Sequence, residues 1–161
     1  MTPMDRESLQ EEFRRVLLTV VGQAYSAAGY ALDERPTQWA GGLFRFLKPL
    51  TAGAFAGLLG VIEYQHLYYP EDGFGRFRIT LARTAQPGQA VPPGQQPTRR
   101  LLSVLVGGDF GVRLLPELEY WWSYAGVPEM GEALAESGRL AVGYGIPWLA
   151  GDLLPPGVGS R

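Results

Sequence analysis

Apolar and polar side chains alternate through much of residues 43–83, and this alternation constrains the fold more than any other feature of the sequence. Within it, Ile62, Tyr64 and His66 occupy alternate positions, and the residues between them are mostly polar. A period of two residues is that of a β-strand, whose successive side chains point to opposite faces. The pattern, together with a later apolar stretch, predicts strands at residues 43–48, 58–68, 75–83 and 99–106.

The second and third strands are expected to form an antiparallel hairpin. Pairing Tyr64 with Ile79 keeps like side chains on each face, because directly opposed residues of a pair share a face. The other pairs in this register are Ile62 with Leu81, His66 with Phe77, Glu63 with Thr80, and Gln65 with Arg78. The connecting residues 69–74 contain proline, aspartate and glycine, which favour turns.

The first strand is expected to pair with the second and complete a meander. Pairing Phe46 with Leu58 places Phe44 opposite Gly60, where a glycine would leave room for the aromatic ring.

Helices are predicted on both sides of these strands in the sequence. Residues 3–28 carry apolar side chains at steps of three and four, with Thr2 as the expected cap and Pro3 in the first turn. A short helix is expected to begin at Pro116 and to carry Leu118, Trp121 and Trp122, and a second is expected to begin at Pro128 and end near residues 143–147.

These elements predict one α+β domain over residues 1–161. We expect an antiparallel meander of about four strands, packed on one face by the long N-terminal helix and the C-terminal helices. Residues 84–98 are rich in proline and glutamine and predict a flexible loop, and residues 154–161 predict a frayed tail.

Charge and composition narrow the functional classes. The net charge is −2 and the pI is about 5.4, which disfavours a nucleic-acid binder, since such proteins usually carry a basic excess. There is no cysteine, so disulfides and cysteine-ligated metals are excluded. No membrane span or secretion signal is visible, which predicts a cytoplasmic protein, and we expect no cofactor and no metal.

His66 is the only histidine and the first candidate for acid–base chemistry, because its ordinary pKa lies near neutral. Glu63 lies on the opposite strand face and cannot orient it, whereas Glu71 and Asp72 follow in the turn. A structural histidine is the simpler interpretation, since a catalytic one needs an orienting group close by.

Glu63, Gln65, Arg76 and Arg78 share one face of the predicted hairpin. They indicate either a ligand- or partner-binding face, with the arginines holding a carboxylate or phosphate, or an ordinary solvated face with cross-strand charge pairs. Of the adjacent tryptophans, Trp122 is the predicted contact residue, because neighbouring residues of a helix cannot both face the core.

The order of short motifs resembles that of small uncharacterised bacterial domain-of-unknown-function proteins of α+β type. The motifs are Ala28-Gly29-Tyr30, Leu43 to Phe46, Ile62 to Gln65, Phe77 to Leu81, the double tryptophan, and Tyr144 to Leu149. The resemblance implies the α+β fold and a bacterial origin, and it implies no catalytic residue.

The sequence therefore predicts a non-enzymatic binding or interaction module with a protein or small-molecule partner. The alternative is a small hydrolase-like enzyme that uses His66 with Glu71 or Asp72. A third possibility, nucleic-acid binding, requires Arg83, Arg99 and Arg100 to join the other face arginines in one basic stripe. The oligomeric state stays open.

Overall fold

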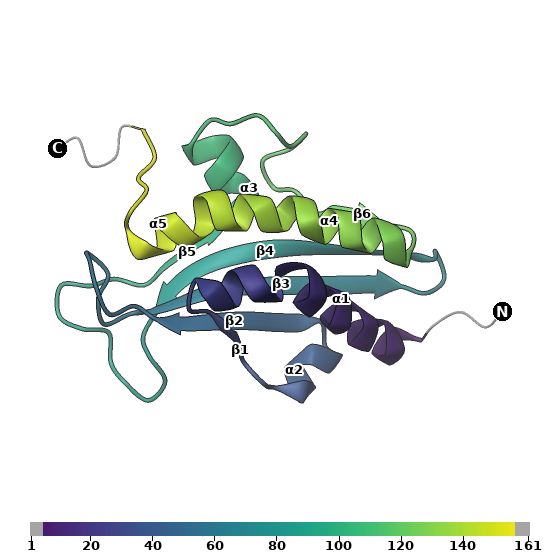
Figure 1. The fold of residues 1–161 in the computed structure, drawn as a ribbon, viewed down its shortest axis with the longest axis horizontal. Helices are drawn as coiled ribbons and strands as arrows, with labels where there is room; N and C mark the ends of the chain where they lie inside the picture. The colour runs from purple at the N-terminus through teal and green to yellow at the C-terminus, as the bar shows by residue number, and fades with distance from the viewer. Residues whose placement is uncertain (1–4, 157–161) are drawn as a thin grey trace.

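A computed structural model describes residues 5–156 and has an α+β fold built on an open, antiparallel sheet of six strands (Figure 1). The strand order is β1-β2-β3-β4-β5, and β6 also pairs with β4. The strands are β1 (Ala31–Leu32), β2 (Leu43–Pro49), β3 (Leu59–Tyr69), β4 (Phe74–Thr84), β5 (Thr98–Leu101) and β6 (Trp122–Tyr124). The predicted fold class is correct, but two strands were missed because β1 and β6 are too short to show an alternation.

Helices lie before, between and after the strands in the sequence. They are α1 (Arg6–Ala27), α2 (Pro36–Ala40), α3 (Leu102–Val104), α4 (Val127–Leu140) and α5 (Ile146–Ala150), with π-helical turns η1 (Leu105–Asp109) and η2 (Ala141–Gly145). Helix α1 begins later than predicted, because the Asp5 carboxylate accepts a hydrogen bond from the backbone nitrogen of Ser8 at 2.7 Å and caps it. The predicted cap, Thr2, and Pro3 lie outside the described residues.

The predicted register of β3 and β4 is confirmed at all five pairs, including Tyr64 with Ile79. The predicted register of β2 and β3 is wrong by four residues: Phe46 lies opposite Ile62, and Phe44 opposite Tyr64. An even shift leaves every side chain on its predicted face, so face alternation alone could not detect the error. Gly60 instead lies opposite Lys48, and a Cβ there would approach the Tyr30 hydroxyl oxygen to 2.8 Å.

The chain after the proline-rich loop differs most from the prediction. Strand β5 ends at Leu101, and the expected continuation to residue 106 is helical, because Leu102, Leu105 and Val106 are buried at helical spacing. The helix predicted from Pro116 is absent among the described residues, and Trp122 lies in β6. Helix α4 begins beside Pro128 as predicted, but η2 and α5 prolong the helical run to Ala150 (Figure 1).

The core lies between the sheet and the helices. Helices α1 and α4 pack against one another over one face of the sheet, which is called the inner face below (Figure 1). The largest fully buried side chains there are those of Phe13, Tyr25, Phe44, Phe46, Tyr64 and Phe77. Burial of such large rings supplies most of the hydrophobic stabilisation. The opposite side of the sheet, the outer face, carries a smaller apolar cluster of Leu59, Val61 and Ala82 at one end.

The proline-rich loop, residues 84–98, contacts another loop. The side-chain nitrogen of Gln95 donates to the carbonyl of Ala54 at 2.8 Å, and that of Gln86 donates to the carbonyl of Gly57 at 3.4 Å. In the predicted frayed tail, Leu154 is exposed and Pro155 is buried, and residues 157–161 lie outside the described part of the chain.

Candidate functional site

Four arginines and one glutamate gather on the outer face of the sheet. Strand alternation places Arg45 of β2, Glu63 and Gln65 of β3, and Arg76 and Arg78 of β4 on this face, and β5 adds Arg99. Trp121, the residue before β6, completes the group through its contacts with two of the arginines. These residues are called the arginine face: Arg45, Glu63, Gln65, Arg76, Arg78, Arg99 and Trp121.

Glu63 is paired with two arginines, one on the neighbouring strand β2 and one on β5, which lies beyond β4. Its carboxylate lies 2.8 Å from the Arg99 guanidinium and 3.4 Å from that of Arg45. The Glu63 side chain is 13% exposed, whereas that of Arg99 is 61% exposed. One carboxylate therefore faces two cations at this position, and the pairs connect β2, β3 and β5 across the sheet.

Arg76 and Arg78 both lie against Trp121. Their guanidinium carbons are 4.3 and 4.7 Å from the centre of the indole ring, within the distance at which a cation is attracted to an aromatic face. The Arg78 Nε donates to the side-chain oxygen of Gln65 at 2.9 Å. Neither arginine forms an ion pair with a carboxylate of residues 5–156. Two like charges are thus held side by side with no carboxylate partner in the described part of the chain.

The predicted contact residue, Trp122, is in the wrong place for this role. It is 2% exposed, and its ring stacks on Phe77 of the inner face at 5.7 Å. The prediction assumed a helix, but Trp122 begins strand β6, and the side chains of Trp121 and Trp122 lie on opposite faces of the sheet. The neighbour, Trp121, is the tryptophan on the outer face, and it could not be chosen without knowing that β6 pairs with β4.

A hollow of about 270 Å³ opens beside the arginine face, between β4 and β5. It is lined by Arg78, Thr80, Arg99, Arg100 and Leu101. This β4–β5 hollow contains three arginines, of which Arg100 forms two hydrogen bonds with Asp109, at 2.5 and 2.8 Å. Arg78 therefore belongs both to the hollow and to the pair that contacts Trp121.

His66 is buried in a polar network on the inner face. Its Nδ1 lies 2.7 Å from the Gln10 side-chain oxygen, and its Nε2 hydrogen-bonds the Tyr124 hydroxyl. The imidazole stacks on the Phe13 ring at 3.9 Å. Gly75 lies opposite Tyr124, and a Cβ at residue 75 would clash with the Tyr124 hydroxyl oxygen. The glycine therefore leaves the space in which this hydroxyl reaches His66.

Burial lowers the pKa of His66 to about 3, so the ring is neutral at physiological pH. Its two ring nitrogens bond to an amide and a phenol, and Glu71 and Asp72 are exposed in the turn between β3 and β4. The structure therefore does not bring His66 together with either carboxylate that the hydrolase alternative requires.

Arg83 does not join the other arginines. It lies on the inner face, 3% exposed, between the rings of Phe55 and Trp148, and its Nε donates to the carbonyl of Leu149 at 3.0 Å. Burial lowers its pKa to about 10, so it stays charged. Arg83 thus binds the carboxyl end of α5 to the sheet, where a cation is favoured by the helix dipole. Arg99 lies opposite Ala82 and extends the face in the way that the nucleic-acid alternative requires, whereas Arg100 lies opposite Leu81 of the inner face and is paired with Asp109.

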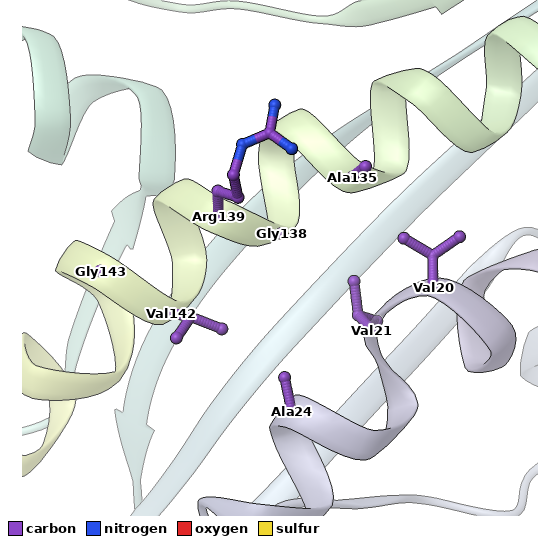
Figure 2. Close-up of a pocket in the computed structure, with 8 residues that line it drawn as sticks. All are labelled: Val20, Val21, Ala24, Ala135, Gly138, Arg139, Val142 and Gly143. Carbon is purple, nitrogen blue, oxygen red and sulfur yellow. The ribbon is translucent and has the colours of Figure 1, made fainter.

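A second concave surface lies between α1 and α4 (Figure 2). This groove of about 470 Å³ is lined almost entirely by small or apolar residues, among them Val20, Ala24 and Val142, and its one charged lining residue is Arg139. It offers shape and apolar area but few groups that could orient a ligand.

Residues 5–156 contain no group of three or more His, Asp or Glu side chains that could hold a metal ion. Over the same residues, no helix is long and apolar enough to cross a membrane. Comparisons with protein-family models, with curated proteins and with solved structures found no match to this chain. The resemblance drawn from the short motifs thus stays a prediction, and a function has to be argued from the geometry.

Proposed function

We propose that this protein is a non-enzymatic binding module that presents its arginine face to an acidic protein partner. The proposal rests on one observation: four arginines and one glutamate share a single sheet face in a chain whose net charge is −2. Such an asymmetric distribution attracts a negative partner and orients it before contact.

The side chains of this face also suit a protein interface. Arginine and tryptophan are enriched among the residues that dominate binding energies. Trp121 is half-buried and contacts both Arg76 and Arg78, so the three side chains are already ordered before a partner arrives. Preordered side chains lose less conformational entropy on binding.

The hydrolase-like alternative receives less support from the site. His66 is 0% exposed and hydrogen-bonded at both ring nitrogens, whereas a general base needs access to a substrate proton. A cytoplasmic location remains part of the proposal, supported by the lack of cysteine in the sequence.

The proposal is tested by affinity capture from a lysate of the source organism, followed by binding measurements on the purified pair. The double charge reversal R76E/R78E should remove the authentic partner, because it places two carboxylates against an acidic surface. The matched control R139E changes an exposed arginine of α4 and should leave capture intact. If every captured protein binds the double variant as well as it binds the unmodified chain, the arginine face is not the interface.

A further inference from the structure

We infer that the β4–β5 hollow binds a phosphate monoester, carried by a phosphorylated side chain of the acidic partner. This inference rests on the proposed function, because the hollow adjoins the arginine face and shares Arg78 and Arg99 with it. It adds a specific chemical group to a face that was otherwise defined only by charge.

The walls of the hollow have the donors that a phosphoryl group requires. Arg78, Arg99 and Arg100 line it, together with Thr80, whose side chain carries a hydroxyl. Guanidinium binds phosphate through two parallel hydrogen bonds and is preferred where such oxyanions are recognised. Thr80 lies between Glu63 of β3 and Leu101 of β5 in the sheet, so the neighbouring strands fix its place in the wall of the hollow.

The arginine face and the hollow together carry a surplus of three positive charges. Of the five arginines, Arg45 and Arg99 share the single carboxylate of Glu63, and Arg100 is paired with Asp109. Arg78 has no carboxylate partner among the described residues, and neither has Arg76, which contacts the same tryptophan. A phosphate monoester carries about −1.5 to −2 near neutral pH and offsets at least half of this surplus, whereas one carboxylate would offset a third of it.

The same charges favour a single phosphate over a nucleic acid. The carboxylates of Glu63 and Asp109, held by two of the lining arginines, would repel the further phosphates of a continuous backbone. A protein segment with one phosphorylated residue brings only one such group. Clusters of arginines recognise phosphorylated segments in several unrelated domains.

The test uses isothermal titration calorimetry with the full chain and short synthetic peptides. One peptide carries a phosphoserine flanked by Glu and Asp, and its partner has an unmodified serine. We expect the phosphorylated peptide to bind about tenfold tighter or more, since hydrogen bonds to a charged group are the strong ones. R78M should reduce this preference to about twofold or less, and T80V should reduce it by a smaller factor, while R139M should leave it unchanged.

The outcomes separate the inference from the proposed function. Equal affinity for the two peptides, with binding lost in R76E/R78E, would refute the phosphate site and leave the acidic interface standing. A phosphate preference that survives both R78M and T80V would also overturn the inference. Failure of both peptides to bind refutes the phosphate site. The capture experiment then tests separately whether the arginine face binds a protein partner. A single-stranded oligonucleotide that binds tighter than either peptide would refute both.

Discussion

At the scale of single residues, five buried polar side chains at the inner face hydrogen-bond to one another in two groups. Gln10, His66 and Tyr124 form one network, and the hydroxyls of Tyr25 and Tyr64 form a second contact at 2.6 Å. An unpaired polar group would destabilise the core, whereas a paired one also restricts which side chains fit together. The lone histidine is therefore explained by packing, and its protonation state is tied to folding.

The pKa of His66 predicts a loss of stability in mild acid. The folded-state pKa of about 3 lies below the ordinary value of 6.5, so below pH 6.5 the unfolded chain takes up a proton that the folded chain does not. The free energy of unfolding should fall by up to about 1.4 kcal/mol per pH unit between pH 6.5 and 3. Urea denaturation at pH 7.5, 6 and 5 measures this slope.

The control for this slope is H66Q, which keeps hydrogen-bonding groups but cannot titrate. It should be less stable at pH 7.5 by about 1–3 kcal/mol, because one partner in the network is lost, and it should lack the wild-type slope above pH 5. Equal slopes in the two proteins would show that His66 is not the group that titrates.

At the scale of elements, small residues set the distance between α1 and α4. Gly138 faces Val21 across the groove, and a Cβ at residue 138 would lie 2.7 Å from the Val21 Cγ1 (Figure 2). The absence of a side chain therefore allows the two helices to pack closely. Gly131, earlier in the same helix, has no atom within 4 Å of the Cβ position.

Substitution by alanine is expected to change the free energy of unfolding in opposite directions at these two glycines. G138A should lower the free energy of unfolding by about 1–3 kcal/mol, because overpacking forces the helices apart. G131A should raise it by up to about 1 kcal/mol, because alanine has the higher helix propensity and meets no obstacle. Denaturant unfolding of both variants checks this, and a similar change in both would show that close packing at Val21 is not the reason for Gly138.

At the scale of the whole molecule, two groups of arginines on β4 have different physical roles. Arg83 is buried and holds α5 against the sheet, whereas Arg76 and Arg78 stand on the outer face without carboxylate partners among residues 5–156. Residues that serve binding often contribute little to the free energy of unfolding, because their charges are not paired within the folded chain.

We therefore expect different effects on stability from the two groups. The double variant R76Q/R78Q should change the free energy of unfolding by less than about 1 kcal/mol, since losing contacts with Trp121 is offset by relief of like-charge repulsion. R83Q should lower it by about 2–4 kcal/mol, because carbonyls at the end of α5 lose their donor in a buried place. Thermal and denaturant unfolding compare the two, and a larger loss in R76Q/R78Q would assign these arginines to the fold.

Much of the sheet and part of the candidate site followed from alternation. The β3–β4 register and the shared face of Glu63, Gln65, Arg76 and Arg78 were predicted correctly, because turn length and matching faces left few alternatives. Arg45 could have been added by the same reasoning, since it lies between Phe44 and Phe46 in the sequence. The burial of His66 was consistent with its apolar neighbours.

The alternation of residues 58–83 determined by itself that these segments are strands and which side chains share a face, because the two-residue period is a local property of the backbone. Only the tertiary structure decided that β5 and β6 lie along the same edge of β4 and so bring Arg99 and Trp121 to the arginines of that strand. These pairings join segments far apart in the sequence. They depend on how the helices pack on the inner face, and this packing cannot be predicted from a local sequence pattern.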